Sequence, residues 1–293
     1  MLYDEKRHPA HTNPRFSSHV RAHEEIISNE FWYTDKTPSL GPGFTAAKTQ
    51  ERTSSVVEIL LRAATRAEKN DTADLAEAYY QLSDKIESCG PGGRCGSLAC
   101  PLCARAYQKA KAAAQQTAIT EATKTRPGKR LVFVTVVPKA MMYSPGEFHE
   151  IEVKKANRWL KDALPVGRRM ILGSADLGWE TGRSGKYIQI HWHLAMWTGN
   201  PYSLEQKLKL RFRKTKKYER PVEVKIPDDL GFLPYMNKAI KLPHLLRTNR
   251  THLPELLLVL DRTEAMDLMV SRRLRLSAQS GQLAFKPIGR REG

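Results

Sequence analysis

Hydrophobic and polar side chains alternate with a period of two along residues 186–197, KYIQIHWHLAMW. Successive side chains of a β-strand point to opposite faces, so the isoleucines, Trp192 and the residues in step with them share one apolar face. His191 and His193 lie on the other face. The pattern predicts a strand with one face in the core and two imidazoles side by side on the opposite face, close enough to bind one ion.

The periodicity of the rest of the chain predicts alternating helices and strands. Helices are expected at residues 54–70, 71–88, 104–124, 146–163, 203–217, 232–241 and 253–271, and Asp71 is the expected N-cap of the second. Strands are expected at residues 131–137, 170–180, 186–197 and 221–226. Strands joined by one hairpin and otherwise separated by helices predict an α+β fold, with a mainly antiparallel central sheet of about five strands flanked by helices.

Shifts in composition divide the 293 residues into four regions. Residues 1–50 are expected to form an irregular basic arm, and residues 51–125 a helical region. The strands fall within residues 126–245, which we expect to form the main domain. Residues 246–293 are expected to form a C-terminal helix and a basic tail.

The chain is strongly basic, with 48 Lys+Arg against 31 Asp+Glu, a net charge of +17 and a pI near 9.8. A soluble protein of this charge usually binds a polyanion, and nucleic acid is the first candidate; a merely cationic surface is the alternative. A track for the DNA backbone is expected at Lys207, Lys209, Arg211, Arg213, Lys214, Lys216 and Lys217, although such a run is often a solvated helix face. Lys241 is expected to contact DNA backbone or solvent.

No apolar run approaches the ~18–20 residues that a membrane span needs. The first residues lack the apolar segment of a secretory signal. We therefore expect no membrane partner and a cytoplasmic location, where structural disulfides are rare.

All four cysteines fall between residues 89 and 103, with the spacing Cys89-x5-Cys95-x4-Cys100-x2-Cys103. Four thiolates suit tetrahedral Zn²⁺, and the final C-x2-C pair is typical of a zinc knuckle. Two disulfides are the alternative, which the expected compartment disfavours. The spacing predicts a structural zinc site that fixes the turn before the helix at 104–124.

The hairpin segment ETGRSGKY, just before the histidine strand, is expected to bring a carboxylate to the histidines. A two-residue turn at residues 185–186 has glycine first, as a type II′ turn requires. That turn pairs Glu180 with His191 and Gly178 with His193. The glycine would leave room for an ion beside the carboxylate.

A turn at residues 182–183 is also possible, and the apolar pattern keeps both Asp176 and Glu180 on the histidine face. Asp176 is therefore the reserve ligand. Glu180, His191 and His193 together predict a site for a divalent cation. These ligand types do not by themselves select Mg²⁺, Mn²⁺ or Zn²⁺, and Mg²⁺ or Mn²⁺ is the expected ion. Two hydrogen-bonded histidines without a metal are the alternative.

Three segments stand in a characteristic order: LVFVTVVPK (131–139) with Thr135, WETGRSGKYIQIHWH (179–193), and PYMNKAIK (234–241). They resemble the three motifs of the HUH endonucleases, and in detail the rolling-circle replication initiators of plasmids and phages. The cysteine-rich segment is similar to a region that precedes the first motif in many of these proteins. The resemblance covers residues 89–242. The first segment departs from the family pattern at Val136, Val137 and Lys139, and the third holds a single tyrosine.

The resemblance implies an HUH/ferredoxin-like nickase domain at residues 126–245, preceded by a helical and zinc-knuckle extension, in the cytoplasm of a prokaryotic host. It implies that the cation held by the two histidines and the carboxylate polarises a DNA phosphate. Tyr235 would then attack, leaving a 5′-phosphotyrosine and a free 3′-OH. Lys238 would favour the phenolate or stabilise charge on the phosphate. The implied partners are origin DNA, as a single strand or hairpin, and the host replication helicase and polymerase.

Other functions remain open at this point. An HUH transposase or relaxase would use the same chemistry, and a zinc-containing DNA-binding protein would have no catalytic use for Tyr235. Two histidines and one carboxylate also hold Fe(II) in oxygenases, but that function leaves the basic charge and the tyrosine unexplained. Tyr202 and Tyr218 are weaker candidates for the nucleophile, because neither has the matching lysine.

Overall fold

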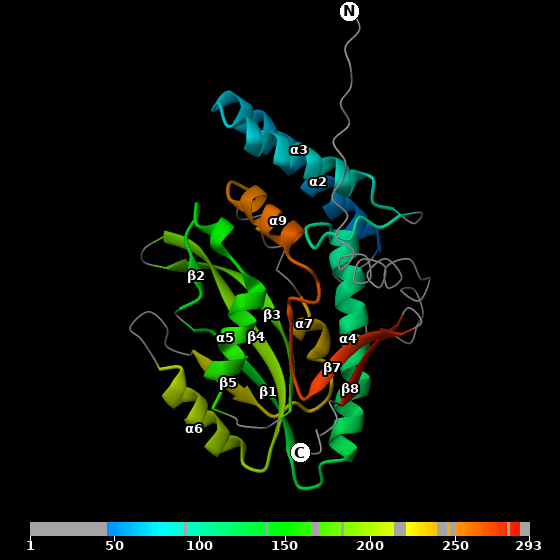
Figure 1. Cartoon of the computed structure of the whole chain (residues 1–293), viewed down its shortest axis with the longest axis vertical. Helices are drawn as coiled ribbons and strands as arrows, with labels where there is room; N and C mark the ends of the chain where they lie inside the picture. Colours follow the sequence, from blue (N-terminus) through cyan, green and yellow to red (C-terminus); the bar gives the residue numbers. More distant parts are fainter. Residues whose placement is uncertain are drawn as a thin grey trace, which may run out of the picture.

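The structure is a computed structural model (Figure 1), which describes residues 46–90, 93–138, 140–165, 170–182, 185–213, 221–238, 245–246, 250–279 and 282–287. Several residues singled out from the sequence lie outside this part of the chain: residues 1–45 of the expected arm, Lys139, Lys214, Lys216, Lys217, Tyr218 and Lys241. Residues 46–50, expected to be the irregular end of that arm, are helical instead.

An open antiparallel sheet forms the centre of the fold, with its strands in the order β5-β1-β4-β3-β6. The strands are β1 (Arg130–Val136), β3 (Ile171–Gly182), β4 (Gly185–Thr198), β5 (Val222–Lys225) and β6 (Met269–Arg272), and the short β2 (Met142–Tyr143) pairs with β4. Every pairing in this sheet among the described residues is antiparallel. The expected α+β class with a mostly antiparallel sheet flanked by helices is confirmed.

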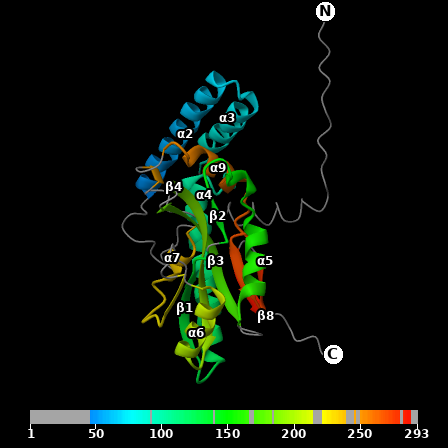
Figure 2. The same cartoon turned by 90° about the vertical axis from the view of Figure 1, so that its left-hand side faces the viewer.

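The two faces of the sheet are covered by different helices. α4 (Pro101–Lys124) and α7 (Leu233–Met236) pack on the face that carries His193. α5 (Val153–Ala163), α6 (Pro201–Arg211) and α9 (Leu253–Arg262) contribute to the core on the opposite face, the one with Trp192. Figure 2 shows α7 and α5 on opposite sides of the strands. The residues of β4 thus alternate as the pattern predicted, with the apolar side chains facing one core and the two imidazoles on the opposite face of the sheet.

The register of the β3–β4 hairpin differs from the expected one. Gly182 pairs with Gly185, so residues 185 and 186 belong to the strand and do not form the expected turn. Glu180 therefore lies opposite Tyr187, and Asp176 lies opposite His191. The register moves by an even number of residues, which leaves every side chain on its expected face. For this reason the hydrophobic pattern cannot distinguish the two registers.

At the N-terminal side, α2 (Ala46–Lys69) and α3 (Ala73–Glu87) pack against each other and on α9. The N-cap of α3 is Thr72, not Asp71 as expected. Asp71 has a φ of 55° and forms the turn between the helices, since aspartate tolerates the left-handed conformation better than most residues. None of the described helices combines the length and apolar character that crossing a membrane would take.

Several helices are shorter than expected. A 3-10 helix, η2 (Phe148–Glu150), precedes α5 within the helix expected at 146–163. α7 covers four residues of the helix expected at 232–241, whose last residues lie outside the described chain. The helix expected at 253–271 ends at Arg262.

The residues after α9 form strands where a helix and a tail were expected. β6 joins the sheet beside β3, and β7 (Leu274–Gln279) and β8 (Gln282–Pro287) form a hairpin that packs against α4. Apolar residues near 265–270 fit a helical face equally well. Pairing with β3 satisfies backbone groups that an unpaired edge would leave without partners, so the strand forms instead.

Candidate functional site

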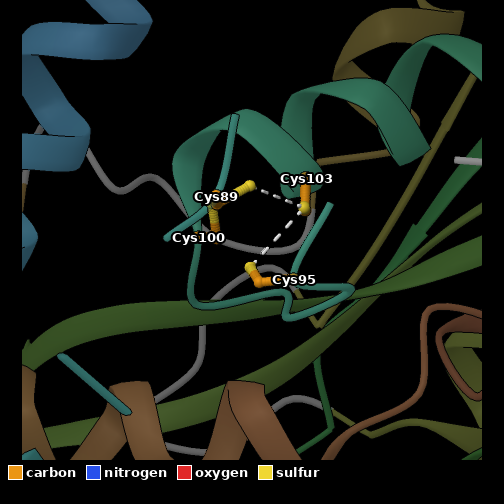
Figure 3. A group of neighbouring side chains, drawn as sticks. All are labelled: Cys89, Cys95, Cys100 and Cys103. Atoms are coloured by element: carbon orange, nitrogen blue, oxygen red, sulfur yellow. Dashed lines mark hydrogen bonds between the residues drawn. The ribbon is translucent and has the colours of Figure 1, made fainter. Parts of the chain in front are cut away.

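The four cysteines meet at the start of α4, where we call Cys89, Cys95, Cys100 and Cys103 the thiol cluster (Figure 3). Cys100 is the N-cap of α4, and Pro101 begins the helix. All four Sγ atoms lie within 4.8 Å of one another, with Cys89 and Cys95 at 3.5 and 3.7 Å from Cys103. Ligands of a tetrahedral Zn²⁺ with Zn–S bonds of about 2.3 Å are about 3.8 Å apart. The spacing therefore suits one metal ion such as zinc.

Hydrogen bonds among the thiols shift their pKa values in opposite directions. They lower the pKa of Cys89 and Cys95, which favours the thiolate, and with burial they raise the pKa of Cys100 and Cys103. The thiolate is the form that ligates metals. Within the described part of the chain, the thiol cluster is the one group of three or more His, Cys, Asp or Glu ligand atoms that converges in this way.

A second group of polar residues lies on the sheet face under α4 and α7. We call it the histidine cluster: Thr135 of β1, Asp176 and Glu180 of β3, His191 and His193 of β4, Tyr235 of α7, and Lys238 just after α7. Residues from four elements thus meet on β4, the strand that pairs with both β1 and β3.

His193 is held on all sides and is 1% exposed. Its Nδ1 lies 3.2 Å from Oγ1 of Thr135, the residue directly across the ladder on β1. The Phe133 ring stacks on the imidazole with 5.7 Å between centroids. Nε2 faces Oδ2 of Asp176 at 3.6 Å. These contacts fix the ring plane and direct its Nε2 edge toward the carboxylate.

Asp176 is as buried as His193. Burial raises the pKa of its carboxyl, but the hydrogen bond with His193 and the charge of Lys238 outweigh it and hold the pKa below its ordinary value of 3.8. Nζ of Lys238 donates to Oδ2 at 2.6 Å and lies 3.5 Å from Nε2 of His193. Oδ1 is buried and has no hydrogen-bond partner among the described residues.

Tyr235 lies against the buried His193, and 46% of the tyrosine's surface is exposed to solvent. Its ring meets the imidazole of His193 edge-on, with 4.8 Å between centroids. Nζ of Lys238 lies 3.5 Å from the centroid of the tyrosine ring, a cation–π contact. The tyrosine and lysine singled out from the sequence therefore meet at His193.

α7 is held in place by amide side chains that the sequence analysis did not single out. Nε2 of Gln108 donates to the carbonyl of Pro234 at 2.6 Å. Asn237 donates to Oε1 of Gln115 and, at 2.9 Å, to the carbonyl of Leu233. Gln108 and Gln115 are two turns apart on α4 and both are buried. The sequence signal that could have indicated these contacts is the presence of two glutamines on the inward face of an alanine-rich helix.

His191 and Glu180 form a separate, more exposed pair. Nε2 of His191 lies 3.7 Å from Oε1 of Glu180, whose side chain is 44% exposed. A Cβ added to Gly178 would lie 2.5 Å from Cε1 of His191, so the imidazole itself fills the space above this glycine. The expectation that Gly178 lies opposite His193 and leaves room for an ion is wrong, because the register pairs Gly178 with Gln189.

The histidine cluster contains donors that suit a divalent cation, since imidazole nitrogen and carboxylate oxygen both bind Mn²⁺. Its donors are arranged as two pairs, and neither Glu180 nor Asp176 converges with both histidines as the thiols converge with one another. The buried, unpaired Oδ1 of Asp176 is the feature that best fits a cation, because Asp176 lies across from His191 and contacts His193.

The described part of the expected DNA track is not beside this cluster. Lys207, Lys209 and Arg211 belong to α6, whose inward residues pack in the core on the opposite face of the sheet. Lys209 pairs with Glu205 at 2.6 Å, and Nε of Arg211 donates to the carbonyl of Ala163. Arg213 follows α6 and is exposed. Their role in DNA binding stays a prediction.

Comparisons of the chain with protein-family models, with curated proteins and with solved structures give no match.

Proposed function

We propose that this protein is a metal-dependent DNA-nicking and strand-transfer enzyme of the HUH type, which starts rolling-circle replication through a 5′-phosphotyrosine. The observation that carries the proposal is the contact of Tyr235 and Lys238 with His193, at 4.8 Å between rings and 3.5 Å between nitrogens. These residues come from the second and third segments of the resemblance, which are far apart in sequence. An HUH-type arrangement of the sheet is further supported by the position of both histidines on the strand between β1 and β3.

In the proposed reaction, Oη of Tyr235 forms a bond to the phosphorus of a DNA phosphodiester. The bond from phosphorus to the 3′ oxygen of the preceding nucleotide breaks. The phenol proton passes to water, and the departing 3′ oxygen takes up a proton to become a free 3′-OH. A second attack by that hydroxyl on the phosphotyrosine reverses these bonds and rejoins the strand.

The surrounding residues have distinct tasks in this reaction. The exposure of Tyr235 gives a DNA strand access to its hydroxyl. Lys238, above the tyrosine ring, stabilises the negative charge that develops on the phenol oxygen and on the phosphate. Thr135 fixes the orientation of His193, against which the tyrosine ring rests.

We propose Asp176, His191 and His193 as the residues that would hold the divalent cation, with Glu180 as the alternative carboxylate. When bound, such a cation polarises a non-bridging phosphate oxygen. Asp176 is preferred because its Oδ1 is buried without a hydrogen-bond partner among the described residues, whereas the carboxylate of Glu180 is half-exposed.

A nicking assay tests the proposal directly. The full chain is incubated with Mn²⁺ and a supercoiled plasmid that carries the DNA flanking its own coding sequence. We expect open circles with protein attached to the 5′ end in denaturing gels, and no adduct from Tyr235→Phe. Tyr202→Phe, an exposed tyrosine on α6, is the matched control and should nick as the parent does. Equal adduct from Tyr235→Phe would exclude Tyr235 as the nucleophile.

The same assay distinguishes the two carboxylates. Asp176→Asn should raise the Mn²⁺ concentration needed for half-maximal nicking, and Glu180→Gln should change it less. The opposite order would assign the cation to Glu180.

A further inference from the structure

A cavity of about 380 Å³ lies between one face of α2 and the residues that follow α7. Four cationic side chains line it: Lys48, Arg52, Arg62 and Arg250. Among the described residues that line it, the acidic ones are Glu51 and Glu58. The cavity therefore carries a net positive charge.

The geometry of the lining suits an anion. Glu58 is already paired with Arg62 one turn along α2, so it neutralises a charge at the far end of the cavity. Nε of Arg250, from the segment that follows α7, donates to the carbonyl of Leu246 at 3.0 Å, which orients the guanidinium. An oriented guanidinium is a strong donor to phosphate oxygens. Buried Ile59 and Leu246 form an apolar floor, which reduces solvent screening of these charges.

The cavity and Tyr235 are connected through one turn of α4. Nη1 of Arg105 donates to Oγ1 of Thr49, next to the cavity residue Lys48. Gln108, three residues further along α4, binds the carbonyl of Pro234, next to Tyr235. Side chains at this spacing lie about 5–6 Å apart on a helix. Figure 2 shows the dark blue N-terminal end of α2 and α7 on the same side of the strands.

The edge of α4 between them is also cationic. Arg105 and Lys109 are one turn apart, so they extend the positive charge of the cavity toward α7.

We propose that this cavity binds a backbone phosphate of the DNA strand that presents its scissile phosphate to Tyr235. The inference rests on the proposed function for its substrate, and it adds a binding site on α2, outside the histidine cluster. The site contacts phosphate and carries no information about base sequence. Its expected effect is to hold the strand in register with the tyrosine.

Binding can be measured independently of nicking. Tyr235→Phe protein is titrated, without divalent cation, into fluorescein-labelled oligothymidylate of about 20 nucleotides at several KCl concentrations. We expect Arg52→Gln/Arg250→Gln to weaken binding about five- to tenfold and to reduce the salt slope by about 0.7 for each phosphate that the variant no longer neutralises. Arg66→Gln/Lys69→Gln removes the same charge from exposed positions of α2 and should change binding much less.

The outcomes separate this inference from the proposed function. If both variant pairs lose the same DNA affinity, the loss is an effect of net charge and the inference is overturned. Unchanged DNA affinity of the cavity pair would also overturn it. Protein that never nicks DNA but still loses affinity through the cavity pair would refute the proposed function and leave the phosphate site standing.

A second variant guards against effects on folding. Ser55→Glu places a carboxylate in the cavity, and Thr65→Glu makes the same change on the exposed part of α2. Weaker binding by Ser55→Glu alone, with equal thermal melting of both variants, supports the site. In nicking assays the cavity variants should need more DNA for half-maximal adduct but reach the parental yield at saturation. A lower yield at saturating DNA would contradict a role in binding alone.

Discussion

Asp176 and Lys238 form an ion pair with little access to water, since their side chains are 2% and 11% exposed. Most other ion pairs of the described residues have a well-exposed partner, and such pairs contribute little to stability. A buried pair behaves differently, because removing one partner leaves an uncompensated charge in a medium of low dielectric. The stability of the fold therefore depends on Lys238 staying beside the carboxylate of Asp176.

We expect Lys238→Met to lower the free energy of unfolding by about 3–5 kcal/mol, since it leaves the Asp176 carboxylate buried with His193 alone. Asp176→Asn should cost less, because the longer lysine can reach water. The double variant should recover much of the loss, with a coupling energy of about 1–3 kcal/mol in urea unfolding. Additive single-variant losses would show that the two charges do not interact.

The acid limb of the stability curve reports on the same pair. Because the pKa of Asp176 is lowered in the folded state, its ionisation stabilises the fold above the ordinary value of 3.8. This stabilisation is lost as the pH falls through the lower folded value. The parent should therefore lose its advantage over Asp176→Asn below about pH 4.

α7 is too short to be stable alone, because a single turn does not repay the entropy of helix nucleation. Its place is set by contacts with α4, through Gln108 at Pro234 and Gln115 at Asn237. Leu233 and Met236 add apolar contacts in the core under α4. The position of Tyr235 therefore depends on α4 as much as on the sheet.

We expect Asn237→Ala to slow adduct formation at saturating DNA, while the Kd for DNA stays unchanged. The substitution removes two hydrogen bonds of α7 and leaves Oε1 of Gln115 buried without its donor, at a cost of about 1–3 kcal/mol. Asn200→Ala is the matched control, because it removes the N-cap of α6 on the other side of the sheet. Equal slowing by both variants would attribute the effect to general destabilisation.

The thiol cluster affects the stability of the whole molecule, because it lies at the N-terminus of α4. That helix contacts α2, α7 and the β7–β8 hairpin, so it joins the cavity, the candidate nucleophile and the C-terminal strands. Cross-linking of the turn by a metal would stabilise all of these contacts together.

We expect the purified protein to contain one zinc ion per chain, and its removal by a strong chelator to lower the melting temperature by several degrees. The four cysteines of the chain all belong to the thiol cluster, so thiol titration reports on this cluster alone. The loaded protein should react slowly, and the chelated, denatured protein should release four thiols. Four fast thiols and no zinc in the native protein would refute a metal at this site.

The alternation along residues 186–197 was sufficient to place His191 and His193 on the face opposite Trp192, because the period of a strand is a local property. The spacing of the four cysteines was likewise sufficient to predict their convergence, since they are close in sequence. Helix α4 and the antiparallel character of the sheet also followed from local patterns and connection lengths.

Tertiary structure decided between arrangements that the local sequence patterns fit equally well. The even shift in hairpin register placed Asp176, not Glu180, across from His191, although both registers bury the same apolar residues. Burial lowers the pKa of Lys111 to about 7, whereas its sequence context indicated only one more cation on a basic helix. Amphipathicity likewise did not indicate which face of the sheet α6 covers.

The sequence by itself thus determined which side chains face together within each element and that the chain is a basic α+β protein with a thiol cluster. The meeting of Tyr235, Lys238 and Asp176 at His193 was decided by the tertiary structure. The physical reason is that these four side chains come from elements that are distant in sequence. The contacts that bring such elements together are not visible in the hydrophobic periodicity of any one element.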